Sequence, residues 1–135
     1  MAGGVTGGVW SFDGWPAGAQ ALAAAILSKR ATSGGWLILT ENVRQQEELA
    51  AEIEAWGQEA VVIPEAFRGS DNVRPDPELE AEWVGALARL TAREKPRLCV
   101  VTEKILQETL PDPGWLRNSL RIVEVGVTLD PLAWV

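Results

Sequence analysis

The chain has 135 residues, 47% of them hydrophobic and 23% charged, the size and composition of one globular domain. A formal net charge of -7 leaves no broad cationic surface for direct nucleic-acid binding, and the absence of histidine excludes His-dependent catalytic triads and His-ligated zinc sites. The single cysteine, Cys99, cannot form an intramolecular disulfide. No apolar run reaches the ~18 residues of a membrane span, so we expect a cytoplasmic protein without a membrane segment.

The amino-terminal third of the chain predicts two strands separated by a helix. Residues 1–8 are small and glycine-rich and are expected to form a flexible leader. An apolar run at residues 9–13 predicts a short strand, and the alanine- and leucine-rich residues 16–30 predict a helix with proline in its first turn. Because this helix is apolar on almost every side, we expect it to be buried. The uninterrupted apolar run Trp36–Thr40 is typical of a parallel strand covered on both faces.

A second helix is expected directly after that strand. Thr40 or Asn42 can serve as its N-cap, and Gly57 is placed to end it. Residues 60–63 predict another buried strand, and residues 64–76 predict a polar, irregular loop.

The next helix is predicted to open at Asp76 and Pro77, with acidic residues in its first turns and arginines in its last. Its apolar residues fall on one stripe, which consists of Leu79, Trp83, Leu87 and Leu90.

The remaining chain continues the alternation of strands and helices. Leu98–Thr102 predicts a third buried strand, residues 103–110 a short helix, residues 111–114 a loop, and residues 119–125 a further strand. Strands that alternate with helices over short connections predict a three-layer α/β/α domain with a mainly parallel sheet.

The turn between the first predicted strand and the first helix is where a nucleotide-binding α/β domain places its phosphate loop. A working loop has the pattern G-x-x-x-x-G-K-[ST], whose lysine neutralises phosphate charge and whose hydroxyl holds magnesium. Here Gly14 and Gly18 stand one residue too close, and Ala19 and Gln20 occupy the lysine and hydroxyl positions. Pro16 also removes one N–H donor. We therefore interpret these five residues as a vestigial phosphate-loop position, with no cofactor bound and no catalytic residue.

The loop at residues 64–76 is a second candidate site, because carboxylates at the carboxyl end of a parallel strand can hold a metal ion or a sugar. Its charged residues are Glu65, Arg68, Asp71, Arg74 and Asp76. No paired-carboxylate spacing supports a metal site among them, and a solvated loop is the simpler interpretation.

Cys99 lies within an apolar run and is interpreted as a neutral core thiol. The chain has seven tryptophans, of which Trp36, Trp56 and Trp83 are predicted on buried faces. The others are candidates for an interface, since tryptophan is enriched at binding hot spots, although ordinary partial burial is the simpler explanation; they are Trp10, Trp15, Trp115 and Trp134.

Five segments, taken in order, resemble the bacterial transcription-repair coupling factor family (Mfd), whose amino-terminal part is similar to the excision-repair protein UvrB. The segments are GWPAGAQALAAAI, WLILTENVRQQEELAAEIEAW, RPDPELEAEWVGALARL, LCVVTEKILQETLP and LRIVEVGVTLDPL. The third is the most telling, because it resembles the family pattern S-P-x-P-E-x-x-x-x-R-L-x-x-L-x-x-L. The chain departs from the family at residues 66–71, where the family usually has W-E-T-L-P-Y.

The resemblance implies that residues 9–125 form a UvrB-like α/β subdomain with a degenerate P-loop, helicase-like nucleotide-binding fold. It also implies that residues 126–135 are the truncated start of a following module, which recruits UvrA. This part of the protein would be a non-catalytic scaffold in transcription-coupled nucleotide-excision repair. It would support the UvrA-recruiting module and make autoinhibitory contacts with other domains of the same polypeptide, while the full-length parent would be an ATP-dependent DNA translocase.

The residues also leave a different class of function open. An α/β domain can bind a small ligand or a nucleotide at the carboxyl ends of its strands, and fold alone does not distinguish that function from a scaffold.

Overall fold

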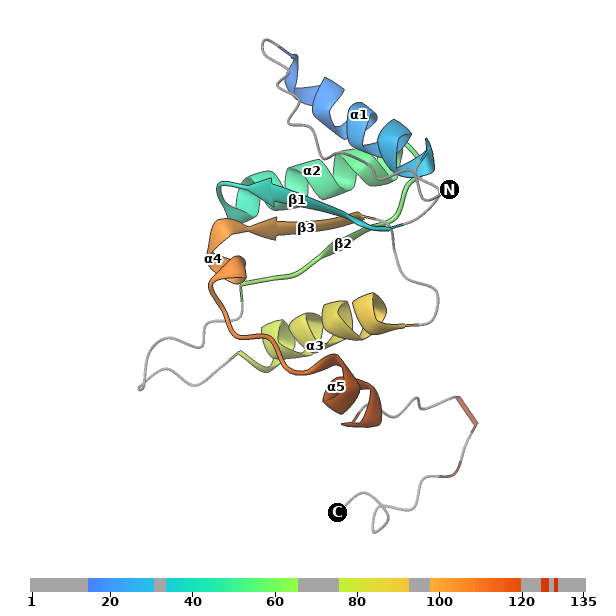
Figure 1. Cartoon of the computed structure of the whole chain (residues 1–135), viewed down its shortest axis with the longest axis vertical. Coiled ribbons are helices and arrows are strands. Elements are labelled where there is room, and N and C mark those ends of the chain that lie inside the picture. The colour runs from blue at the N-terminus through green and yellow to red at the C-terminus, as the bar shows by residue number, and fades with distance from the viewer. Residues whose placement is uncertain are drawn as a thin grey trace, which may run out of the picture.

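The computed structural model of the chain describes residues 15–30, 34–65, 76–92, 98–119, 125, 126 and 128. Its elements in chain order are α1 (Ala17–Arg30), β1 (Trp36–Thr40), α2 (Val43–Ala55), β2 (Ala60–Val62), α3 (Pro77–Thr91), β3 (Leu98–Thr102), α4 (Glu103–Leu106) and α5 (Pro113–Ser119). The described strands form one all-parallel sheet in the order β1-β3-β2 (Figure 1). This small α/β domain, in which parallel strands alternate with helices, confirms that part of the predicted fold class.

The sheet is built around β3, whose five residues are all buried. Alternate side chains of β3 enter two separate clusters, as the pleat of a strand requires. Leu98 and Val100 join Ile53 of α2 in one cluster, and Cys99 and Val101 join Trp83 of α3 in the other. Figure 1 shows the corresponding arrangement, with α1 and α2 on one side of the strands and α3 on the other.

The two longest capped helices begin where the sequence predicted. Asn42 is the N-cap of α2, and its side-chain oxygen accepts a hydrogen bond from the Gln45 backbone N–H at 3.0 Å. Asp76 caps α3 in the same way, accepting from the Glu78 N–H at 3.0 Å. Thr40, the alternative cap of α2, instead donates its hydroxyl to the Val101 carbonyl at 3.3 Å, which ties β1 to β3. Gly57 follows α2 with a φ of 75°, a conformation that glycine adopts without strain.

Among the described strands β1 lies at an edge of the sheet. Its side chains are partly exposed, so the prediction that Trp36–Thr40 is covered on both faces was wrong. Leu37 and Leu39 are 55% and 56% exposed. They lie opposite Cys99 and Val101 in the register, on the face where α3 packs over β2 and β3. An apolar run does not reveal whether a strand lies at the centre or the edge of its sheet.

The prediction that the first helix is buried was also wrong. Only one face of α1 is enclosed, where Ala21 and Ala25 are buried on the side of α2. Ile26 and Leu27 are 42% and 43% exposed. The alanines allow close packing on one face, and the larger apolar residues fall on faces that no described element covers.

Of the tryptophans predicted to be buried, only Trp83 is, at 2% exposure. Trp36 is 40% exposed because it begins the edge strand, and Trp56 is 51% exposed because it is the C-cap of α2. Trp15 and Trp115 are 41% and 61% exposed, while Trp10 and Trp134 lie outside the described residues.

The boundaries after β3 differ from the predicted ones. The helix predicted at 103–110 ends at Leu106, and the loop predicted at 111–114 gives way to α5 at Pro113. Ser119 closes α5 and is not in a strand. Val125 is in a turn and fully exposed, while residues 120–124 lie outside the described part of the chain.

Several predictions fall outside the described residues. They concern the leader at 1–8, the strand at 9–13, Gly14, most of the loop at 64–76, and the module at 126–135 apart from Gly126 and Thr128. Among the residues that are described, no helix has the length and apolarity needed to cross a membrane.

Candidate functional site

The turn at the amino terminus of α1 contains four of the five residues that the sequence predicts as a vestigial phosphate-loop position, namely Pro16, Gly18, Ala19 and Gln20. The Ala19 N–H donates to the Pro16 carbonyl at 2.9 Å, which closes the turn, and Gly18 is exposed. A Cβ added at Gly18 would meet no atom within 4 Å, so nothing described near it requires glycine. From Trp15 to Gln20 the chain offers neither a cationic side chain nor a hydroxyl. This turn therefore lacks the groups that hold phosphate and magnesium.

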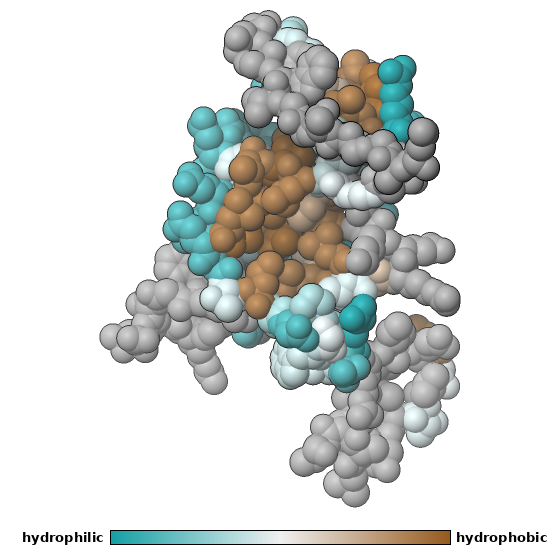
Figure 2. Space-filling view, in the orientation of Figure 1, coloured by the Kyte–Doolittle hydropathy of each residue, from teal (hydrophilic) through white to brown (hydrophobic). Residues whose placement is uncertain are grey.

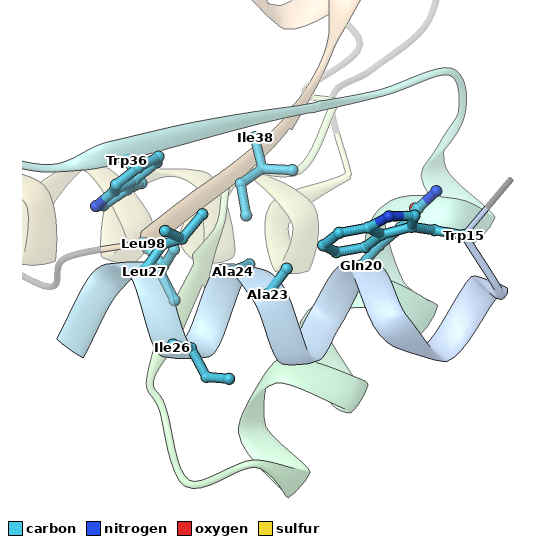
Figure 3. Close-up of a pocket in the computed structure, with 9 residues that line it drawn as sticks. All are labelled: Trp15, Gln20, Ala23, Ala24, Ile26, Leu27, Trp36, Ile38 and Leu98. Carbon is cyan, nitrogen blue, oxygen red and sulfur yellow. The ribbon is translucent and has the colours of Figure 1, made fainter. Parts of the chain in front are cut away.

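An apolar hollow of about 450 Å³ lies beside this turn, between α1 and β1 (Figure 3). The residues that line it are Trp15, Gln20, Ala23, Ala24, Ile26, Leu27, Trp36, Ile38 and Leu98. Gln20 is the only one among them with an amide, hydroxyl or charged side chain. The hollow has the size of a small-ligand pocket, but it lacks the convergent polar groups that orient a polar ligand.

The small side chains of α1 create the hollow. Figure 3 shows Ile38 extending from β1 toward Ala23 and Ala24, whose methyl groups are too short to fill the space between helix and strand. Trp36 lies at one end of the hollow and Trp15 at the other (Figure 3). The two indole rings therefore form the ends of a space that an apolar side chain from another segment can fill.

The hollow continues along α1 into a shallower one of about 300 Å³. The two share Trp15, Ala23 and Ile26. The apolar residues of α1 that do not face α2 are thus arranged along an open, continuous strip.

The opposite face of β1 is apolar and open as well, at Leu37 and Leu39. Figure 2 shows hydrophobic side chains gathered over the strands on the face of the molecule in view. We refer to the hollow together with Leu37 and Leu39 as the β1 surface. Large exposed apolar patches mark protein–protein or membrane interaction sites and ligand-binding grooves.

Polar side chains meet at the carboxyl ends of β2 and β3. The Thr102 hydroxyl donates to Glu65 Oε1 at 2.7 Å, and Lys104 Nζ donates to Glu65 Oε2 at 2.9 Å. The hydrogen bond from Thr102, followed by that from Lys104, holds the pKa of Glu65 below its ordinary value. Both carboxylate oxygens are thus engaged within the protein, and this cluster acts as a latch between the end of β2 and the start of α4.

The candidate site predicted in the loop at 64–76 is described at only three residues, Pro64, Glu65 and Asp76. Glu65 belongs to the latch and Asp76 to the cap of α3. Arg68, Asp71 and Arg74 lie outside the described residues. No group of three or more acidic or cysteine side chains lies close enough to hold a metal ion in the part of the chain that is described.

Cys99 is 8% exposed and confirms its predicted place in the core. Burial raises the pKa of its thiol to about 11. The side chain is therefore a neutral thiol at physiological pH, as is typical of a structural cysteine in a core.

The sequence interpretation singled out the turn before α1 but missed the hollow beside it. The signal that was available is the apolar character of α1 on every side, which we interpreted as burial. No protein-family model, curated protein or solved structure matches the chain. The resemblance to the coupling factor family therefore stays a prediction, which rests on the five segments alone.

Proposed function

We propose that this chain is a non-catalytic interaction domain, a scaffold of the kind found at the amino terminus of transcription-repair coupling factors, and that the β1 surface is its docking site. The observation that carries the proposal is the apolar hollow directly beside a phosphate-loop position that has no phosphate-binding side chain. The proposed occupants are other domains of the same polypeptide. UvrA is recruited by the module that follows, and the setting is cytoplasmic DNA repair.

The proposal includes the finer description of the fold, a three-layer α/β/α domain of degenerate P-loop, helicase-like type. Its support is the placement of α1 and α2 on one side of the strands and α3 on the other, together with the all-parallel sheet. The turn before α1 stands where such a fold keeps its nucleotide site, and here it carries Ala19 and Gln20.

The buried polar side chains support a structural role. Thr40 bonds the Val101 carbonyl, Thr102 bonds Glu65, and Ser28 bonds the Ala25 carbonyl at 2.9 Å. The Thr40 and Thr102 hydroxyls join separate elements, and the Ser28 hydroxyl bonds within α1. The Glu65 carboxylate that accepts from Thr102 is also bonded by Lys104, and these two hydrogen bonds lower its pKa, which makes it a weaker base than a free carboxylate. A non-enzymatic function agrees with this arrangement.

The alternative function, a ligand site at the carboxyl ends of the strands, has less support. The apolar hollow reaches Trp36 and Leu98, the first residues of β1 and β3, and so extends to the amino ends of the strands. At the carboxyl ends, Glu65 is engaged by Thr102 and Lys104.

The docking proposal is tested by placing a charge on the β1 surface. The variants are Leu27→Glu in the hollow and Leu37→Glu on the opposite face, with Leu110→Glu as the control because Leu110 is 46% exposed and outside both. Binding of each to the remaining domains of a bacterial coupling factor is measured by biolayer interferometry. We expect the first two variants to bind at least about tenfold more weakly, which corresponds to about 1.4 kcal/mol, and the control to bind like the parent chain. The absence of a complex, or an equal loss in all three variants, would contradict the proposal.

A further inference from the structure

A groove of about 930 Å³ lies at the other edge of the sheet, along β2, and the proposed function does not use it. We call it the β2 groove. α2 and α3, which pack on opposite faces of the sheet, form its two walls, and Ala60 and Val62 of β2 lie between them. The remaining lining residues are Val43, Gln46, Glu47, Glu54, Pro64, Glu65, Leu79, Glu82, Gly85, Ala86 and Arg89.

The backbone of β2 presents hydrogen-bonding groups to this groove. The Ile63 N–H donates to the Val100 carbonyl of β3 at 3.3 Å. Because the direction of backbone groups alternates along a strand, Val61 and Ile63 face β3, and the N–H and C=O groups of Ala60 and Val62 face away from it. No strand pairs with this edge within the described residues. An open edge of this kind is a template for another strand.

Gln46 adds a polar atom at the groove that has no partner. Its side chain is fully buried, and its Nε2 donates to the carbonyls of Ile63 at 2.9 Å and Val100 at 2.8 Å. These two acceptors fix the orientation of the amide. Its Oε1 is consequently left without a hydrogen-bond donor among the described residues, at a position where Gln46 lines the groove. A buried acceptor without a donor lowers the stability of the fold.

The walls of the groove are negatively charged. Glu47 and Glu54 of α2 and Glu82 of α3 line it, and none of the three forms an ion pair with a described residue. The one cation in the lining, Arg89, is paired with Glu59. The carboxylates are too dispersed to hold a metal ion, since no group of three described acidic side chains comes together. A ligand whose positive charges are spread along its length fits this distribution.

We propose that the β2 groove binds an extended segment of a partner protein that is rich in lysine or arginine, and that this segment adds a strand to the edge of β2. Alternate side chains of an added strand point to opposite walls. Its cations face Glu47 and Glu54 on α2, and its apolar residues face Leu79 and Ala86 on α3. A second copy of the chain does not fit, because a symmetric contact would bring the same acidic walls against each other.

The test uses the full chain, labelled with ¹⁵N, and two octapeptides as probes. One peptide alternates Lys and Val, and the other alternates Glu and Val. We expect the Lys peptide to shift the backbone resonances of β2 and the side-chain amide of Gln46, with a Kd below millimolar. The Glu peptide is expected to bind at least about tenfold more weakly because its charges meet carboxylates.

N-methylation of the Lys peptide distinguishes strand addition from binding by charge alone, because a methylated backbone nitrogen can no longer donate a hydrogen bond. In one version the nitrogens of the odd residues are methylated, and in the other those of the even residues. Only one of the two sets faces β2 in an added strand, so one version is expected to lose binding and the other to keep it.

The contribution of the walls is measured with two matched double variants of α2. Glu47→Gln with Glu54→Gln removes two charges from the groove, and Glu48→Gln with Glu52→Gln removes two exposed charges of the same helix outside it. We expect the Lys peptide to bind the first variant about tenfold more weakly and the second with little change.

Four results would overturn the proposal. They are no binding of the Lys peptide up to millimolar concentration, equal binding of the Glu peptide, equal effects of the two methylation patterns, and equal losses in the two double variants. Concentration-dependent dimerisation that shifts the β2 resonances would assign the groove to a second copy of the chain and would overturn it as well.

Discussion

Glu65 illustrates how single residues hold this small domain together. Its side chain is 20% exposed and connects the end of β2 with Thr102 at the end of β3 and Lys104 in α4. Hydrogen bonds to an ionised carboxylate stabilise a fold more than hydrogen bonds to a neutral acceptor. Because hydrogen bonds from Thr102 and Lys104 lower its pKa, the latch stabilises the folded state more when Glu65 is ionised than when it is protonated.

The loss of stability caused by Glu65→Gln is therefore expected to depend on pH. At pH 7 the variant is expected to be less stable by about 1 kcal/mol, because the amide keeps an acceptor for Thr102 but loses the ion pair with Lys104. A folded-state pKa below the ordinary value of 4.5 means that the contribution is complete above 4.5 and is lost as the pH falls through the folded-state pKa. Urea unfolding of both proteins between pH 3 and 7 measures the difference. A difference that stays constant over this range would contradict the latch.

Cys99 is expected to be unreactive in the folded protein. Its burial and a pKa of about 11 leave almost no thiolate at pH 8, and a thiolate is needed for exchange with Ellman's reagent. We expect no reaction over minutes in native buffer and one thiol per chain in guanidinium. Rapid reaction of the native protein would show that the central strand opens readily.

At the scale of elements, α3 contains a glycine that its environment does not require. Gly85 lies inside the helix and is exposed, and a Cβ added there would meet no atom within 4 Å. Gly85→Ala should therefore stabilise the domain by about 0.5–1 kcal/mol, because alanine has less backbone entropy to lose. The midpoint of thermal unfolding should rise by a few degrees. A lower unfolding midpoint for Gly85→Ala would contradict this prediction, because it would mean that the added methyl group clashes with its surroundings.

The strands show what an apolar pattern predicts and what it leaves open. The runs WLILT and LCVVT both predict buried parallel strands, and both are strands of the sheet. LCVVT is central and fully buried, whereas WLILT is at the edge with Leu37 and Leu39 exposed. Strand order is decided by how the helices cross between strands, and the composition of a single run does not contain that information.

An aspartate followed by a proline marks the start of two helices, and the sequence analysis recognised only the first of them. Asp76 followed by Pro77 correctly predicted the start of α3. Asp112 followed by Pro113 begins α5 in the same way, and Asp112 Oδ1 accepts a hydrogen bond from the Trp115 N–H at 2.9 Å. The shortness of the segment and the glycine at 114 favoured a loop in the sequence, whereas burial of Leu116 against the α3 cluster stabilises the helix.

At the scale of the whole molecule, the two edges of the sheet differ in character. The β1 surface is apolar, with Trp36, Leu37 and Leu39 at least 40% exposed, while the β2 groove has carboxylates on both walls. The interpretation of the turn before α1 as a vestigial phosphate-loop position stays a prediction from the sequence. The sequence analysis did not locate either surface, because the order of the strands decides which faces of the neighbouring elements stay uncovered.

We propose that the domain has no nucleotide chemistry, and the decisive experiment is calorimetric titration of the chain with Mg-ATP and Mg-ADP. The turn at Pro16, Gly18, Ala19 and Gln20 has neither a cation nor a hydroxyl for a phosphate, so we expect no binding heat up to millimolar nucleotide, a limit of about -4 kcal/mol in binding free energy. Micromolar binding of either nucleotide would contradict it and would place a working site beside α1.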